Sequence, residues 1–141
     1  MDSLQHPATE RLSAADAGLR LAIVALTLAT ATIHASLGGL LFMANAAGYA
    51  TLAIAMIMPL PIASRYRWLI RFGLFGFTAA TIAGWLAFGA RFPLAYVDKG
   101  IEALLVGCLV AEAYRLDSGP LESFRRLVRL ARTGIGRVAG A

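Results

Sequence analysis

Four ionisable residues stand inside otherwise apolar stretches of this sequence: His34 in one stretch, and Asp98, Lys99 and Glu102 in another. In a helix, residues three or four apart share a face, so the last three would lie together. Ionisable groups within an apolar span cost free energy and mark proton, ion or ligand sites by default. Two interpretations stay open: a proton- or ion-responsive cluster, and an ion pair that fixes one helix against another.

The spacing also predicts that His34 and Glu102 meet at one level. His34 lies nine residues before Met43, the expected end of its span, which is about 13 Å along a helix. Glu102 lies eight residues after Leu94, the expected start of its span, which is about 12 Å. Lys99 and His34 are then the expected partners of Glu102. If that span begins nearer Lys99, the lysine instead lies among lipid headgroups.

A further acid, Glu112, falls near the end of the same stretch. Buried acids are normally paired. We expect Glu112 to reach toward the interface or to pair with Arg115 or with an arginine between the second and third spans.

The composition explains why such residues are conspicuous. The chain has 141 residues, of which 59% are apolar and 15% charged, and its mean hydropathy is +0.70. A soluble domain of this size cannot hide so much apolar side chain. One cysteine and few Lys and Glu exclude a disulfide scaffold and a coiled coil. An integral membrane protein remains.

The apolar residues divide into four runs that predict an all-α, transmembrane, up-down-up-down four-helix bundle. The expected spans are 21–43, 44–62, 68–90 and 94–115, within a membrane domain over 20–115. The links are short, and the first is expected at Asn45–Tyr49, where Asn and Gly permit a tight reversal. Short links place consecutive helices side by side. Residues 1–19 are expected to form a cytoplasmic, partly helical tail.

Basic residues predict the orientation. Of the 13 Lys and Arg, only Arg91 and Lys99 fall on one side of the predicted bundle. The other 11 fall in the two tails, in the second link, or, for Arg71, just inside the span that follows that link. The positive-inside rule then places both termini in the cytoplasm, in a multi-pass protein of the inner (plasma) membrane. The same distribution favours anionic lipid over nucleic acid as the reason for the net charge of +5.

The last segment, 116–141, is basic and amphipathic. Its apolar residues recur at three- and four-residue spacing, and its polar side carries Arg125, Arg126, Arg129 and Arg132. Such a helix usually lies on the inner leaflet. Docking of a partner protein is the alternative.

Other chemistry is missing from the sequence. There is no GxSxG, P-loop, GxGxxG, CxxC or HExxH pattern, and the second histidine, His6, is in the tail. We therefore expect no metal, no cofactor and no complete catalytic site, and Cys108 reads as a small buried hydrophobe. Haem held by two His34 side chains across a dimer is a lesser alternative.

The segments IHASLGGLLFMANAAGY (33–49) and FPLAYVDKGIEALLV (92–106) show a recurrent pattern. It resembles that of small four-span membrane proteins of bacteria and archaea with no assigned activity. The resemblance implies a four-span fold over about 20–115 and draws attention to His34, Asn45, Lys99 and Glu102.

These observations favour a non-enzymatic structural or accessory subunit of a membrane assembly. Its expected partners are the bilayer and either other membrane subunits or further copies of itself. A small oligomeric transporter or channel with a His34/Glu102 site is the first alternative. A redox accessory subunit that contacts quinone or haem near His34 is the second.

Overall fold

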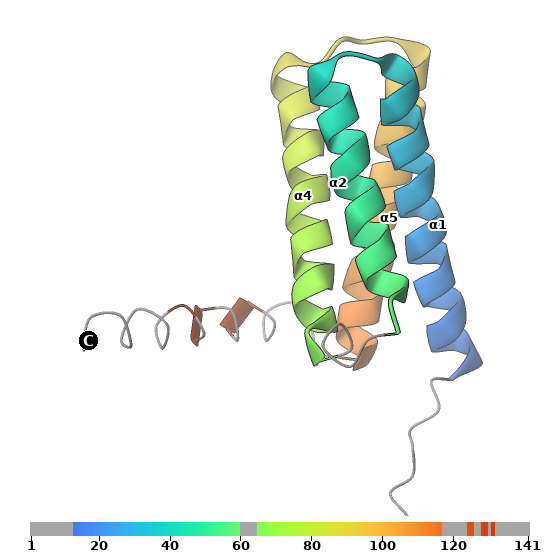
Figure 1. The fold of residues 1–141 in the computed structure, drawn as a ribbon, viewed down its shortest axis with the longest axis vertical. Coiled ribbons are helices and arrows are strands. Elements are labelled where there is room, and N and C mark those ends of the chain that lie inside the picture. Colours follow the sequence, from blue (N-terminus) through green and yellow to red (C-terminus); the bar gives the residue numbers. More distant parts are fainter. Residues whose placement is uncertain (1–12, 60–64, 117–123, 126–127, 130, 132–141) are drawn as a thin grey trace, which may run out of the picture.

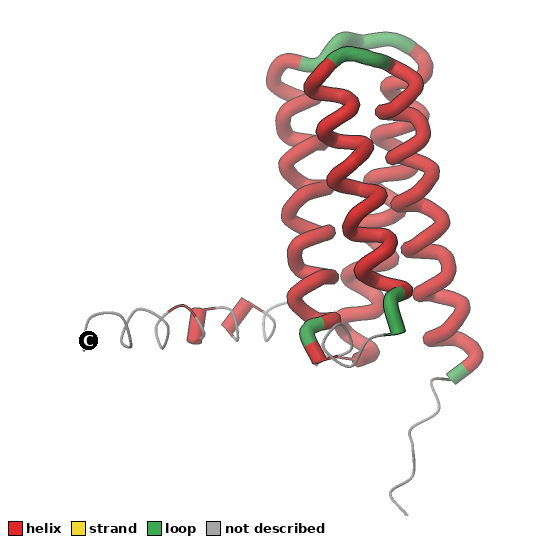
Figure 2. The backbone as a smooth tube through the Cα atoms, in the orientation of Figure 1, coloured by secondary structure: helices red, strands yellow, loops and turns green. Residues whose placement is uncertain are grey.

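The computed structural model describes residues 13–59, 65–116, 124–125, 128–129 and 131. Within this part the chain is all-α and forms four long helices. They are α1 (Ala14–Leu37), α2 (Leu40–Ile57), α4 (Arg67–Phe88) and α5 (Pro93–Leu116). They lie side by side as a bundle (Figures 1 and 2).

The two ends of the bundle differ. The α1–α2 and α4–α5 turns lie at one end, called here the Gly38 end (Figure 1). The end of α2, the start of α4 and the end of α5 lie at the other, called the Tyr66 end. Helix α1 packs against α2 and α5, and α4 completes the ring with fewer contacts to α2 and α5.

The first turn corrects a prediction. We expected the reversal at 45–49, but it is at Gly38 and Gly39, whose φ angles are 68° and 80°. With ψ angles of 178° and 154°, both residues occupy a backbone region that is essentially restricted to glycine. Two such glycines end α1 six residues before Met43, and the expected link lies inside α2.

Local sequence explains the other boundaries. The Ser13 hydroxyl caps α1 by accepting a 3.1 Å hydrogen bond from the Asp16 amide. Helix α2 ends two residues before Pro59, and Pro93 opens α5, where a missing amide proton costs nothing. Helix α1 therefore begins inside the expected N-terminal tail.

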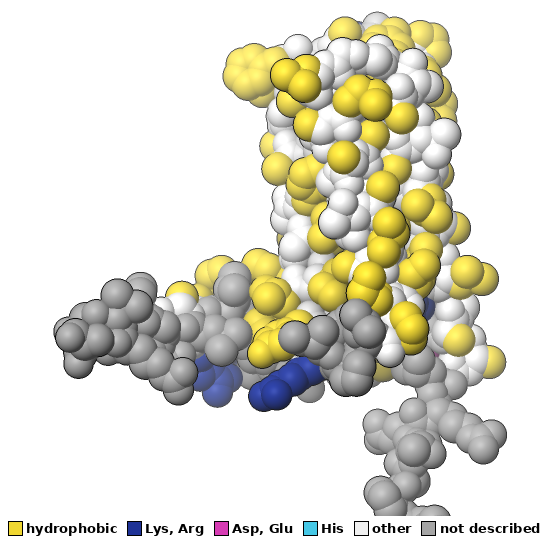
Figure 3. Space-filling view, viewed as in Figure 1, with side chains coloured by type: hydrophobic (Ala, Val, Ile, Leu, Met, Phe, Trp, Pro, Cys, Tyr) yellow, Lys and Arg dark blue, Asp and Glu magenta, His cyan; other side chains and the backbone are white. Residues whose placement is uncertain are grey.

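Three helices, α1, α2 and α4, are long and apolar enough to cross a membrane. Helix α5 is as long as α1 but carries several charged residues. It turns its acids inward, since Asp98, Glu102 and Glu112 are buried. Apolar side chains cover much of the surface between the two ends, and basic atoms gather at the Tyr66 end (Figure 3).

An apolar layer occupies the middle of the bundle. Leu105 and Leu109 of α5 are buried on the face that carries Glu102 and Glu112, and they lie between those two acids in the sequence. They belong to one packed cluster with Ile23, Met56 and Leu74. The layer therefore separates polar groups near the Gly38 end from those near the Tyr66 end.

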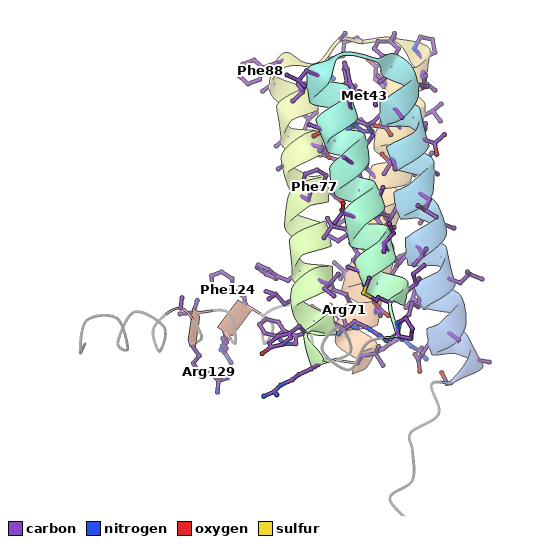
Figure 4. The ribbon with its side chains drawn as sticks, in the orientation of Figure 1. Met43, Arg71, Phe77, Phe88, Phe124 and Arg129 are labelled. Atoms are coloured by element: carbon purple, nitrogen blue, oxygen red, sulfur yellow. The ribbon has the colours of Figure 1, made fainter. Side chains whose placement is uncertain are left out.

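Little of the C-terminal segment lies within the described residues. Phe124 and Arg125 are helical, as are Val128 and Arg129, and the Phe124 ring lies 6.3 Å from that of Phe72. Phe124 and Arg129 point to opposite sides (Figure 4). Residues 1–12 of the expected N-terminal tail, and Arg126 and Arg132 of the expected amphipathic helix, lie outside the described residues.

Candidate functional site

All four helices contribute to a buried polar cluster in the half of the bundle toward the Gly38 end. We call it the His34 cluster. Its members are Thr30 and His34 of α1, Tyr49 of α2, Thr81 of α4, and Asp98, Lys99 and Glu102 of α5.

Glu102 is the hub of this cluster, and its side chain is 0% exposed. Its Oε1 accepts hydrogen bonds from the hydroxyls of Tyr49 at 2.8 Å and Thr81 at 3.0 Å. Its Oε2 accepts one from Lys99 Nζ at 2.5 Å. A buried carboxylate is tolerated when it is paired and hydrogen-bonded, and Glu102 meets both conditions.

Asp98 ties α5 to α1. The Thr30 hydroxyl donates a 2.6 Å hydrogen bond to Asp98 Oδ1, and Lys99 Nζ lies 3.1 Å from Asp98 Oδ2. His34 Nδ1 lies 3.6 Å from Asp98 Oδ1 and 2.9 Å from the Thr30 carbonyl oxygen. A carbonyl oxygen only accepts hydrogen bonds, so Nδ1 carries a proton in this geometry.

The structure brings all four predicted residues together but changes their pairing. Lys99 does bridge to Glu102, whereas His34 faces Asp98 and reaches Glu102 through Thr30. His34 and Glu102 do meet at one level, since their side-chain ligand atoms lie within 4.8 Å of each other, although α1 ends at Leu37 and not at Met43. The Lys99 side chain is only 12% exposed and pairs with both acids inside the bundle.

Three potential metal ligands meet here, although the sequence predicted no metal site. Atoms of His34, Asp98 and Glu102 lie within 4.8 Å of one another. However, the Lys99 ammonium contacts both carboxylates and already supplies a positive charge. A metal ion would have to compete with it, so we treat Lys99 as the cation that this site is built around.

Three members of the cluster, Thr30, Tyr49 and Thr81, are absent from the predicted set. Tyr49 belongs to the segment 45–49, where we expected the first link. It is 0% exposed, and its ring packs edge-on against Phe77 with centroids 4.9 Å apart. Thr81 carries no signal in the sequence beyond its hydroxyl.

A second buried cluster lies near the Tyr66 end and is centred on Glu112, which is also 0% exposed. Arg20 Nε of α1 lies 3.2 Å from one carboxylate oxygen, and Arg71 Nη1 of α4 lies 3.6 Å from the other. The expected pairing with Arg115 is wrong, because that residue pairs with Asp16 at 2.6 Å. This Glu112 cluster joins α1, α4 and α5, and its Arg71 side chain lies near the Tyr66 end in Figure 4.

A cavity of about 470 Å³ lies beside the His34 cluster, toward the Gly38 end. Its lining includes His34, Asp98 and Lys99, but most of its wall is apolar and aromatic. The cavity therefore brings an apolar and aromatic wall next to buried polar groups.

Comparisons with protein-family models, with curated proteins and with solved structures find no match to this chain. The features that bear on function are therefore the His34 cluster, the Glu112 cluster, the cavity and the distribution of charge.

Proposed function

We propose that this protein is a non-enzymatic integral membrane protein that serves as a structural or accessory subunit of a membrane assembly. The main support is the way its buried acids are paired with basic groups. Glu102 and Glu112 each pair with basic groups from the same chain, across several helices. Such contacts hold helices in one arrangement, and the outside of the bundle stays apolar for lipid or other subunits.

In this proposal the four helices cross the inner (plasma) membrane as an up-down-up-down bundle. Helix α5 spans it together with the three more apolar helices, since its acids face inward. Both termini are cytoplasmic. Support comes from Arg65, Arg67 and Arg115, which lie at the Tyr66 end, whereas Arg91 lies in the turn at the opposite end.

The C-terminal segment is proposed to be an amphipathic helix on the cytoplasmic leaflet. Arg125, Arg126, Arg129 and Arg132 would contact anionic lipid, each contributing about 1 kcal/mol near a charged surface. Docking on a partner protein remains the alternative. We further propose membership of the small four-span proteins of bacteria and archaea that the sequence resembles.

Extraction from the native membrane tests the proposal. The full chain should be isolated in lipid nanodiscs without detergent exchange, and its native mass measured. An accessory subunit should carry other membrane proteins, or further copies of itself, in a fixed ratio. A bare monomer at native expression would refute the assignment. Arg20→Met with Glu112→Leu, which loosens the bundle internally, should weaken the assembly, whereas Leu104→Met on the exposed face of α5 is the matched control.

A transporter or channel is the second candidate, favoured by the cavity that reaches Asp98 and Lys99. The apolar layer around Leu74, Leu105 and Leu109 opposes it, since all three are almost fully buried across the ion path. Proteoliposomes with Glu102→Gln and His34→Ala separate the two. Unchanged flux in both variants would eliminate the transport role.

A redox accessory role near His34 is the third candidate. Haem there would show a visible absorption band in protein purified from its own membrane, and no such band is expected under the main proposal.

A further inference from the structure

We infer that the cavity beside the His34 cluster binds a neutral, planar, carbonyl-bearing molecule from the membrane, of the quinone class. This binding site goes beyond the accessory role, and it stands whether or not a partner subunit is found. Four features support it: the shape and wall of the cavity, its access, its unused hydrogen-bonding groups and its charge.

The wall suits a flat aromatic body. The cavity holds about 470 Å³, within the range of about 300–1,000 Å³ that is usual for small-molecule pockets. Four aromatic residues line it beside the apolar ones, namely Phe42, Phe77, Trp85 and Phe92; Phe88 also borders it, but its ring points outward and is 93% exposed. Aromatic rings prefer offset-stacked or edge-on contacts with other rings, which a planar quinone can make.

The cavity is reached through the side of the bundle. Ala80 and Gly84 of α4 line it and are themselves exposed, and a Cβ on Gly84 would meet no atom within 4 Å. Helix α2 packs less extensively against α4 than against α1. An apolar tail attached to the ligand can therefore extend between α2 and α4 into lipid.

The polar side of the cavity offers hydrogen bonds that the protein does not use. Lys99 has three N–H donors, of which two face Asp98 and Glu102. Among the described residues, the Asn45 amide and His34 Nε2 have no hydrogen-bonding partner, and both residues line the cavity. The amide and the ammonium suit a carbonyl oxygen, and the imidazole nitrogen suits a hydroxyl.

Charge selects a neutral ligand. With a neutral imidazole, Asp98 and Glu102 exceed the charge of Lys99 by one negative unit. An anion would therefore be repelled by the cluster, and the position beside the two carboxylates that a cation would take is already held by the Lys99 ammonium. A neutral carbonyl compound avoids both costs, and its carbonyl and hydroxyl forms match the donors and the acceptor present.

Tryptophan fluorescence tests the inference directly. The chain has two tryptophans, Trp85 in the cavity wall and Trp68 at the opposite end of α4, 17 residues away or about 25 Å along the helix. The Trp68→Phe protein retains only Trp85, which reports on the cavity. The Trp85→Phe protein retains only Trp68, which is distant from it. The probes are duroquinone and ubiquinone-1, whose fully substituted rings do not alkylate Cys108.

Binding in the cavity should quench the Trp68→Phe protein in a saturable way, at one quinone per chain. The Trp85→Phe protein should show only the linear quenching of a quinone dissolved in the micelle. Linear and equal quenching in both proteins would overturn the inference.

Two further variants keep the result tied to the cavity. Gly84→Leu, made in the Trp68→Phe protein, fills the space beside Trp85 and should abolish the saturable component. Gly76→Leu is the matched control, because it lies on α4 outside the cavity and also has open space for a side chain. Equal binding by both leucine variants would contradict the assignment.

The carbonyl is tested separately from the apolar body. Asn45→Leu should weaken binding about three- to tenfold, the effect of one neutral hydrogen bond. Durene, the hydrocarbon with the same ring and methyl groups as duroquinone, should not displace the quinone at a tenfold excess. Displacement by durene with no effect of Asn45→Leu would show an unselective apolar pocket and refute the quinone-class assignment.

Discussion

Removal of one hydroxyl from Tyr49 tests how strongly the His34 cluster holds the bundle together. Tyr49→Phe deletes the 2.8 Å donor to Glu102 and the 2.8 Å contact with Thr81. The ring itself can keep its edge-on contact with Phe77 and its 5.6 Å approach to His34. The substitution therefore isolates the hydrogen bond from the packing.

The magnitude follows from the character of the acceptor. A hydrogen bond to a charged group contributes about 1.5–3 kcal/mol in soluble proteins. Interhelical hydrogen bonds in a membrane bundle average about 0.6 and reach about 1.7 kcal/mol. Glu102 is 0% exposed and retains Thr81 as a second donor to the same oxygen. We expect a loss of about 1.5–2 kcal/mol, at the upper end of the membrane range because no water can replace the hydroxyl.

The assay is reversible unfolding of the full chain by SDS from mixed micelles, followed by circular dichroism. Tyr96→Phe is the matched control, because Tyr96 is 55% exposed and its hydroxyl has no hydrogen bond within the described residues. It should change the free energy of unfolding by less than about 0.5 kcal/mol. Equal effects of the two substitutions would refute the view that Glu102 depends on Tyr49.

Three other substitutions test the turn, the apolar layer and the Glu112 cluster by the same unfolding assay. Gly38→Ala should lower the free energy of unfolding by about 1–3 kcal/mol, because its backbone angles are essentially restricted to glycine. The control Gly100→Ala, in a helix with open space, should be neutral or stabilising. A larger loss for Gly100→Ala than for Gly38→Ala would contradict this. Leu105→Ala should cost about 2–5 kcal/mol, since that side chain is 0% exposed; a cost below 1 kcal/mol would show that the layer is loosely packed. Glu112→Gln should cost about 3–5 kcal/mol by leaving buried arginines without their counter-charge, and a stable variant would show that the pair is dispensable.

Glu102 and Glu112, the two glutamates of α5, show how much of the site could be predicted from the sequence. The sequence indicates Glu102 as a site residue because a carboxylate eight residues inside an apolar stretch is not expected to be solvent-exposed. The structure places it at the hub of the cluster. Glu112 was recognised as an acid that needs a partner. Its partner was misassigned, because Arg20 is 92 residues away in the sequence and only the packing of α1 against α5 makes it adjacent.

Composition and local pattern by themselves determined the helical character, the apolar helices and the residues of interest on α5. Hydrophobicity and charge act on each residue individually, so their signals survive in a linear sequence. The first turn was predicted at the wrong place because Asn and Gly within 45–49 also have turn propensity. Its position at Gly38 and Gly39 is evident only from their backbone angles. The predicted end of the first span was therefore six residues too late, and the depth calculated for His34 was too large.

Only the tertiary structure decided which polar groups share a site. Tyr49, Thr81 and Glu102 come from three helices, and their 2.8–3.0 Å contacts depend on how each helix is rotated about its axis. The cavity likewise exists because α4 packs less closely against its neighbours beside Ala80 and Gly84. Helix rotation and packing gaps are properties of several segments at once, and no single stretch of sequence contains them.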